Sequence, residues 1–219
     1  MERMMLYFAF GYVPVVCLTL AAYAKRNRIM RMIFKPLLIP SLMILYALAA
    51  PKSNVWVLLA LGFGWAGDVF LLGHHHWNVY GGMASFALGH ACYITGMLLT
   101  QPGLHPILLL SVAWIGACLL LVRRFLIPHA PKRLKPWAQC YTVLLSGVCA
   151  TALYLACVSG FNAAYVLCFF GGLLFFVSDG LLAFDMFGRK TRLGNFFVMT
   201  TYILAQTALA VGFVLHGGI

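Results

Sequence analysis

Two aspartates are embedded in apolar stretches of this chain, and carboxyl groups in such places can act as a general acid or base. Asp68 and Asp179 each end an apolar run. The other two of the four acidic residues are Glu2, near the N-terminus, and Asp185, which lies beside a basic run. A carboxylate within a bilayer costs about 2.5–3.5 kcal/mol on insertion scales unless it is paired, neutralised or facing water. These two positions therefore predict a functional site.

Two carboxyl groups that share a poorly solvated pocket can hold different protonation states. A low dielectric disfavours the ionised form of a carboxyl group, and a neighbouring carboxylate disfavours it further. One of Asp68 and Asp179 can then donate a proton while the other accepts one, as general acid–base catalysis requires. The alternative interpretation is structural: two aspartates that form hydrogen bonds between helices.

Five further polar side chains lie in apolar stretches where they suit the same site. His90 and Tyr93 are three residues apart, and Tyr202 and Gln206 are four apart, so each pair shares one face of a helix. Lys35 begins another apolar stretch, where its ammonium group can hold a phosphate. Each also has a structural interpretation, as an interhelical hydrogen-bonding residue or, for Lys35, as a cation that snorkels to the membrane surface.

Neither the histidine run nor the cysteines predict a metal site. His74, His75 and His76 are consecutive, and adjacent residues on a helix point about 100° apart. No second group of ligands has the spacing of a zinc site. The seven cysteines are scattered singly, without a Cys-x-x-Cys motif, which is typical of small apolar core residues. We therefore predict a site without a metal or another cofactor.

Membrane-spanning helices are the elements that must position these residues. The chain is 63% hydrophobic and 9% charged, far from the balance of a soluble domain, and a span needs roughly 20 apolar residues. This composition predicts an all-α, polytopic transmembrane helix bundle with about eight spans in a single integral membrane domain, 1–219. The predicted spans are residues 5–24, 32–50, 54–73, 79–100, 104–122, 137–158, 162–187 and 194–216.

The distribution of basic residues predicts the orientation of these spans. With eight spans, 13 of the 15 Lys and Arg residues fall on one face, within 25–35, 123–135 and 189–192, and only Arg3 and Lys52 fall on the other. The positive-inside rule makes the first face cytoplasmic and both termini non-cytoplasmic. The net charge of +11 then reflects topology and contact with anionic lipids. Basic patches with interleaved aromatic residues are missing, so nucleic acid is not a predicted partner.

The two halves of the chain, 1–127 and 128–219, resemble each other. Asp68 and Asp179 lie late in predicted spans that are four apart, and the next span in each half carries one of the polar pairs. Because the two aspartate-bearing spans are an even number of spans apart, they cross the membrane in the same direction, which predicts a parallel four-span repeat. At 1.5 Å per residue, Asp68 and Asp179 lie about 7 and 12 Å from the cytoplasmic ends of their helices. We therefore expect one cavity that opens toward the cytoplasmic leaflet.

The ordered set of motifs resembles the YhhN-like lysoplasmalogenase family, over nearly the whole chain. The resemblance implies an eight-span ether hydrolase that cleaves the vinyl-ether bond of lysoplasmalogens to a fatty aldehyde and glycerophosphoethanolamine or glycerophosphocholine. It also implies an inner or plasma membrane location in a bacterium, or the endoplasmic reticulum in a eukaryote. The resembling segments are Ile33-Phe34-Lys35-Pro36-Leu37, Gly67-Asp68, His90-x-x-Tyr93, Ser178-Asp179-Gly180 and Tyr202-x-x-Ala205-Gln206.

The resemblance also assigns roles to the polar residues. It implies that Asp68 and Asp179 are catalytic. It implies that the partners are a lysophospholipid substrate and the membrane lipids. It also implies that the substrate pocket is lined by Lys35, His90, Tyr93, Tyr202 and Gln206.

Vinyl-ether hydrolysis is chemistry that two carboxyl groups can perform. A proton is added to the alkene carbon, and water traps the resulting oxocarbenium ion, a cation similar to the one that glycosidases stabilise with paired carboxylates. The residues leave open which aspartate is the acid. The main alternative is a proton-coupled transporter in which Asp68 and Asp179 bind or relay protons. A zinc-dependent intramembrane hydrolase and a non-catalytic lipid-binding protein are further alternatives.

Overall fold

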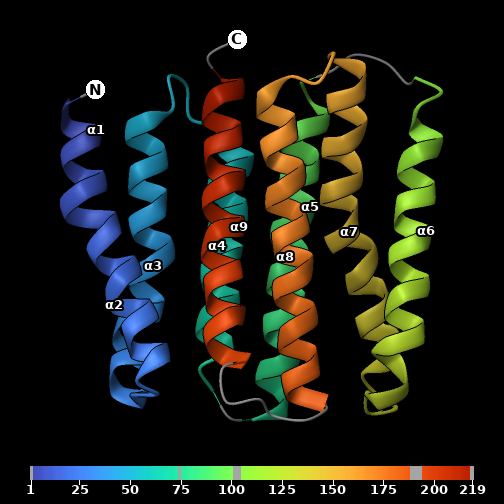
Figure 1. Ribbon diagram of the computed structural model, residues 1–219, viewed down its shortest axis with the longest axis horizontal. Coiled ribbons are helices and arrows are strands. Elements are labelled where there is room, and N and C mark those ends of the chain that lie inside the picture. The colour runs from blue at the N-terminus through green and yellow to red at the C-terminus, as the bar shows by residue number, and fades with distance from the viewer. Residues whose placement is uncertain (1, 74, 101–104, 188–193, 218–219) are drawn as a thin grey trace.

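The computed structural model is a bundle of long helices that run side by side, and it describes residues 2–73, 75–100, 105–187 and 194–217 (Figure 1). The first rod consists of α1 (Glu2–Tyr7), a π-helical turn (Phe8–Tyr12) and α2 (Val13–Ala24). The other long helices are α3 (Arg28–Ala49), α4 (Val55–Phe70), α5 (His76–Leu98), α6 (Leu108–Phe125), α7 (Lys135–Val158), α8 (Ala163–Phe187) and α9 (Gly194–His216). The described residues contain no strand, so the predicted all-α class is confirmed.

The length and hydropathy of the helices are those of a polytopic membrane protein. Six rods in the described ranges are long and apolar enough to cross a membrane: 2–24, α3, α6, α7, α8 and α9. Helix α4 is apolar but has only 16 residues, and α5 is not among the six, so the count of eight spans stays a prediction. Large apolar side chains such as Phe10 and Leu109 are more than 70% exposed, which suits a surface that faces lipid.

Local signals explain several helix ends. Asn27 and Asn54 precede α3 and α4 in extended conformation, and their side chains accept hydrogen bonds from the backbone N–H groups of Met30 (3.2 Å) and Trp56 (2.9 Å). Such caps satisfy N–H groups that have no partner inside the helix. Between α7 and α8, Gly160 has a φ of +68°, a conformation that glycine adopts without strain.

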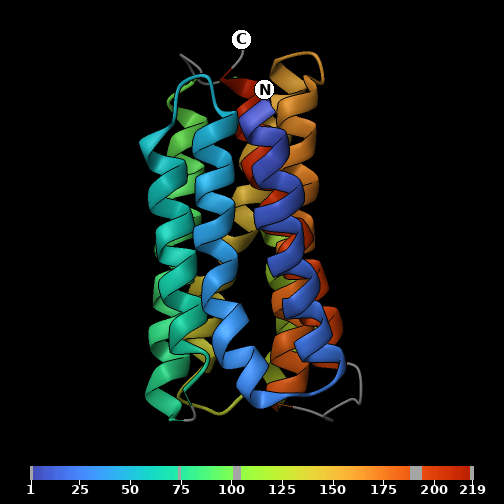
Figure 2. The ribbon, with the colours of Figure 1, turned by 90° about the vertical axis from the view of Figure 1, so that its left-hand side faces the viewer.

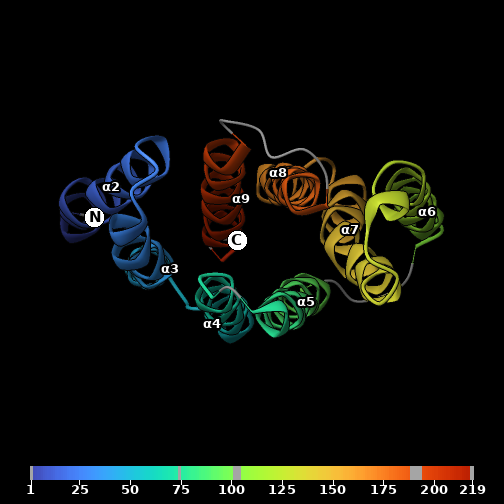
Figure 3. The same cartoon turned by 90° about the horizontal axis from the view of Figure 1, so that it is seen from below.

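The arrangement of the rods places α9 inside a curved row of the others. Viewed along the bundle, α9 lies next to α3, α4 and α8 (Figure 3). From the side, α3 lies between α2 and α4 (Figure 2). Helices α8 and α9 approach closely because of small residues: a Cβ atom on Gly171 would lie 3.0 Å from the backbone nitrogen of Leu209. This packing gives α9 an inner position from which its polar face can reach α4.

The two chain ends lie at the same end of the bundle (Figure 1). The turn after α2 and the segment 126–134 lie at the opposite end, together with the basic residues near them. Arg189, Lys190 and Arg192, which the sequence assigns to the same face, lie outside the described residues. We call the end formed by the turn after α2 and by 126–134 the basic end.

Candidate active site

Asp68 and Asp179 lie on the wall of one cavity of about 650 Å³, which we call the polar cavity. Within their helices, Asp68 lies two residues from the end of α4 and Asp179 eight residues from the end of α8. At 1.5 Å per residue, both are within about 12 Å of the basic end. The cavity is lined by Tyr23, Arg28, Arg31, Met32, Lys35, Asp68, Leu71, Leu72, Gly73, Asn78, Val79, Phe86, Ser178, Asp179, Leu182, Asp185, Met186, Asn195, Val198, Met199 and Tyr202.

The carboxyl group of Asp68 contacts two donor side chains, the ammonium of Lys35 and the phenol of Tyr202. The Nζ atom of Lys35 lies 3.2 Å from Oδ1 of Asp68, and the side chains are only 9% and 3% exposed. The hydroxyl of Tyr202 donates to Oδ2 at 2.6 Å. An ammonium and a phenol that both donate to one carboxyl group stabilise its ionised form. Asp68 thus lies between α3, α4 and α9, with a hydrogen-bond donor at each of its carboxyl oxygens.

Tyr202 is itself held by a chain of hydrogen bonds. The hydroxyl of Tyr93 donates to Oε1 of Gln206 at 2.8 Å, and Nε2 of Gln206 lies 3.5 Å from the hydroxyl of Tyr202. A Cβ atom on Gly64 would come within 3.1 Å of that amide nitrogen, so glycine leaves room for it. Of the predicted pocket residues, Lys35 and Tyr202 line the polar cavity, whereas Tyr93 and Gln206 lie behind it and orient Tyr202.

His90 was predicted to line the pocket, but it lies behind the walls of the two cavities. Its Nδ1 atom lies 2.5 Å from the carbonyl oxygen of Phe86, and its ring packs edge-on against Phe175 and Tyr141. Its Nε2 atom is buried and has no hydrogen-bond partner. His90 is absent from the walls of both cavities described here, so the structure brings it to the rings around the site and not to the wall.

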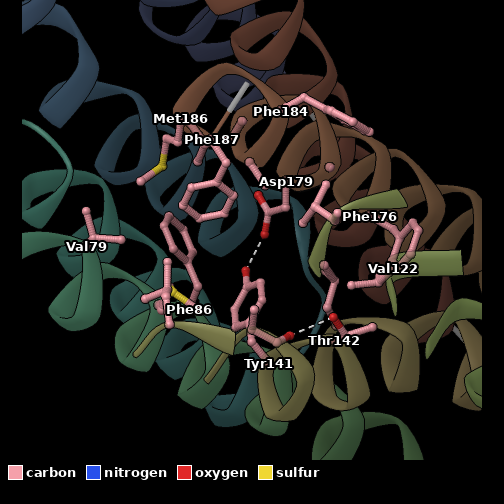
Figure 4. Close-up of a pocket in the computed structure, with 18 of the residues that line it drawn as sticks. Val79, Phe86, Val122, Tyr141, Thr142, Phe176, Asp179, Phe184, Met186 and Phe187 are labelled. Carbon is pink, nitrogen blue, oxygen red and sulfur yellow. Dashed lines mark hydrogen bonds between the residues drawn. The ribbon is translucent and has the colours of Figure 1, made fainter. Parts of the chain in front are cut away.

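Asp179 has a different partner, the phenol of Tyr141 on α7. The hydroxyl of Tyr141 donates to Oδ2 of Asp179, and Figure 4 shows the two side chains pointing toward each other. Asp179 remains partly exposed to the cavity, unlike Asp68. The sequence reasoning missed Tyr141. A phenol within an apolar span is a weak signal, because a buried tyrosine hydroxyl usually finds a partner but other tyrosines of this chain lie in apolar spans as well.

A second cavity, of about 140 Å³, also borders Asp179 and is lined mainly by α5, α6, α7 and α8. We call it the apolar cavity, because hydrocarbon side chains form most of its wall (Figure 4). It is lined by Leu71, Val79, Met83, Phe86, Leu121, Val122, Phe125, Leu126, Leu134, Ala138, Tyr141, Thr142, Leu145, Phe176, Asp179, Gly180, Leu182, Ala183, Phe184, Met186 and Phe187.

Two arginines lie on the wall of the polar cavity toward the basic end. Arg31 donates from Nε and Nη2 to the carbonyl oxygens of Ala22 (3.3 Å) and Tyr23 (3.2 Å), and its guanidinium lies 4.5 Å from the centre of the Tyr23 ring. Arg28, one turn earlier on α3, is exposed. The polar cavity therefore combines cationic groups at one end with the two carboxyl groups farther in.

The residues weighed as metal ligands are placed as follows. His74 and the side chain of His76 lie outside the described part of the chain, and His75 is exposed before α5. Within the described ranges, no three His, Cys, Asp or Glu side chains form a group that could hold a metal ion. All seven cysteines are free, and four of them, Cys92, Cys118, Cys149 and Cys168, are buried.

The fold and this site define a polytopic helical membrane protein with two carboxyl groups on the wall of one cavity. Residues 30–213 match the model of the YhhN family, and the chain belongs to that family.

The chain is similar to three mammalian proteins named lysoplasmalogenase TMEM86B. It is 33% identical to the Homo sapiens protein over 132 residues, which cover 59% of this chain and 51% of that protein. It is 28% identical to the Mus musculus protein over 176 residues (80% and 71%) and 30% identical to the Rattus norvegicus protein over 168 residues (76% and 65%). The match thus spans about half the length of the human relative. No solved structure matches the chain.

Proposed function

We propose that the protein is a lysoplasmalogenase, an ether hydrolase that converts a lysoplasmalogen and water to a fatty aldehyde and glycerophosphoethanolamine or glycerophosphocholine. The observation that carries the proposal is the placement of Asp68 and Asp179 on one cavity wall with unlike partners. Family membership and the names of the mammalian relatives support the same activity.

The unlike partners suit the two carboxyl groups to unlike roles. Asp68, paired with Lys35 and Tyr202, is suited to remain a carboxylate that stabilises a cation or activates water. Asp179 adjoins an apolar wall, where a low dielectric favours the protonated form, and this suits it to carry and donate a proton. The phenol of Tyr141, which donates to Asp179, then stabilises the carboxylate that remains after the transfer. We therefore assign Asp179 as the general acid and Asp68 as the carboxylate, a choice that the sequence left open.

The reaction then proceeds through three proton transfers. The proton of Asp179 is added to the alkene carbon next to the one that bears the ether oxygen, and the electron pair of the double bond forms the new C–H bond. The oxocarbenium ion that results lies near the Asp68 carboxylate, and water adds to its cationic carbon. The proton released by this water returns to Asp179. In the collapse of the hemiacetal, the proton of its hydroxyl is transferred to the glycerol oxygen as the bond between this oxygen and the former alkene carbon breaks, which releases the aldehyde and the glycerol hydroxyl.

The cations of the polar cavity suit the phosphate of the substrate. Lys35 was predicted to hold this phosphate, but its ammonium pairs with Asp68. We propose that the phosphate lies closer to Arg28 and Arg31 than to Lys35, because guanidinium groups bind phosphate oxygens in a fixed, often bidentate geometry. His90, Tyr93 and Gln206 then act as residues that position the site from behind, instead of contacting the lipid.

The orientation in the membrane completes the proposal. We propose that the basic end is cytoplasmic, that both termini are non-cytoplasmic, and that the substrate enters from the cytoplasmic leaflet. We also propose that 1–219 forms one integral membrane domain with eight spans, whose halves 1–127 and 128–219 are parallel repeats.

The decisive experiment measures aldehyde release from a lysoplasmalogen by the purified protein in detergent, where no ion gradient exists. Wild type should release aldehyde. Asp68→Asn and Asp179→Asn should each lower kcat at least about a hundredfold, the usual loss when a general acid or base is removed. Glu2→Gln, which changes an exposed carboxylate on α1, should match wild type. Near-normal turnover in both aspartate variants would contradict the mechanism. No aldehyde from wild type would favour transport or lipid binding.

A further inference from the structure

The polar and apolar cavities meet at Asp179. Six residues line both: Leu71, Val79, Phe86, Asp179, Leu182 and Met186. Five of the six are hydrocarbon or thioether side chains, so the carboxyl group of Asp179 is the ionisable group at the junction. A molecule that occupies both cavities must therefore pass this carboxyl group.

The two cavities offer opposite chemistry. The polar cavity carries Arg28, Arg31 and the Lys35–Asp68 ion pair. In the apolar cavity, the polar side chains have partners: the Tyr141 hydroxyl donates to Asp179, and Oγ1 of Thr142 donates to the carbonyl oxygen of Ala138 at 2.7 Å. Its remaining wall is formed by Leu, Val, Ala, Phe and Met side chains and by Gly180. Such a wall binds hydrocarbon, because removing methylene groups from water is favourable.

We infer that the apolar cavity binds the hydrocarbon chain of a single-chain lipid whose phosphate-bearing head group occupies the polar cavity, so that the first chain carbons lie at Asp179. The inference rests on the proposed function and adds to it the position of each part of the substrate. The chain carbons next to the glycerol oxygen are those of the vinyl ether, so the general acid faces the carbon that it protonates. At about 140 Å³, the apolar cavity has room for a segment of one chain.

Gly180 provides a way to fill the apolar cavity without disturbing its wall. It lies on the face of α8 that also carries Phe176, Ala183 and Phe187, and all four line the cavity. A Cβ atom added to Gly180 would meet no other atom within 4 Å. A leucine there extends into the space assigned to the chain. The helix itself gains stability, because leucine has a higher helix propensity than glycine.

Gly116 is the matched control. It also lies inside a long apolar helix, α6, and a Cβ atom added there would likewise meet no atom within 4 Å. It lines neither of the two cavities. Gly180→Leu and Gly116→Leu therefore make the same change in chemistry, one inside the apolar cavity and one outside it.

The test uses an alkyl-ether lysophospholipid, which has no vinyl ether to hydrolyse, with a diazirine in the middle of its chain. After illumination of the purified protein, mass spectrometry should place the label on wall residues of α6 and α7 such as Leu121 and Leu145. Gly180→Leu should lower this labelling at least tenfold and raise KM for the lysoplasmalogen at least tenfold. Gly116→Leu should match wild type in both measurements. Addition of unlabelled lysophospholipid should suppress the labelling.

The outcomes separate this inference from the proposed function. Labelling on these walls that Gly180→Leu removes, in a protein that releases no aldehyde, would support the lipid site and overturn the activity. Aldehyde release with labelling and KM unchanged in Gly180→Leu would overturn the inference and leave the activity standing. Equal labelling by a two-chain phospholipid that carries the same diazirine would overturn the assignment to a single-chain lipid.

Discussion

Lys35 and Asp68 form a buried ion pair that joins α3 to α4, with 3.2 Å between Nζ and Oδ1. A pair of this kind needs both partners, because a charge left alone in an apolar interior loses its compensation. The pair also fixes the carboxyl group that we assign as the carboxylate of the reaction. The contribution of the ion pair to stability can therefore be measured separately from the catalytic role that we propose for Asp68.

Lys35→Met should destabilise the fold by about 3–5 kcal/mol, the cost of removing one partner of a buried ion pair. The double variant Lys35→Met with Asp68→Asn should recover most of this loss, because it leaves no unpaired charge. Both variants should lack aldehyde release. The measurement is unfolding in detergent by heat or denaturant, followed by circular dichroism.

Lys52→Met is the control for this pair, since Lys52 is exposed in the segment between α3 and α4. It should unfold like wild type. Equal loss of stability in the single and double variants would show that the ion pair does not hold α3 against α4.

Tyr141→Phe should lower kcat about 10- to 100-fold and leave KM nearly unchanged. The ring remains, and the variant loses the hydroxyl that donates to Asp179. A hydrogen bond to a charged group contributes about 1.5–3 kcal/mol, and 1.36 kcal/mol corresponds to tenfold in rate. Steady-state kinetics on the lysoplasmalogen separate the two constants, and a purely structural role would change the fraction of folded protein instead.

Tyr165→Phe is the matched control, because its hydroxyl lies 2.9 Å from Oγ1 of Thr100. Tyr165 lies near the start of α8, toward the end of the bundle opposite Asp179. Its kinetics should equal those of wild type. If Tyr141→Phe raised KM and kept kcat, the phenol would act on substrate binding and would not position the acid.

The sequence located the two carboxyl groups because burying a carboxylate is costly and therefore conspicuous. It also located Lys35, but with a phosphate as the expected partner. Lys35 and Asp68 lie on different helices, and a sequence read one helix at a time does not show which spans pack together. For the same reason, Tyr93 and Gln206 were predicted to line the pocket but form the hydrogen-bonded chain behind Tyr202.

Tyr141 could not be distinguished from the other tyrosines. A phenol in a span costs little, because it can turn toward the interface or toward a neighbouring backbone carbonyl. The ends of the predicted spans lie within a few residues of the observed helix ends, because polar breaks separate the apolar runs in the sequence. Helix α5 shows the limit of hydropathy: it is not among the six helices apolar enough to span, although it has 23 residues and carries His90.

Gly212→Leu should destabilise the fold by about 1–3 kcal/mol or more, the usual cost of overpacking. A Cβ atom there would lie 2.5 Å from Sγ of Cys168 and 2.9 Å from the carbonyl oxygen of Ala164. The thiol can rotate, but the carbonyl belongs to the backbone of α8, so α8 and α9 would have to separate. Gly62→Leu is the control, because a Cβ atom on Gly62 meets nothing within 4 Å.

The separation of α8 from α9 should also reach the site, because α9 carries Tyr202 and α8 carries Asp179. Gly212→Leu should therefore lose aldehyde release in proportion to the unfolded or loosened fraction, whereas Gly62→Leu should keep both stability and turnover. Unfolding in detergent and steady-state kinetics on the same samples make the comparison. A stable, fully active Gly212→Leu protein would show that the close packing of α8 on α9 is not what holds these two helices together.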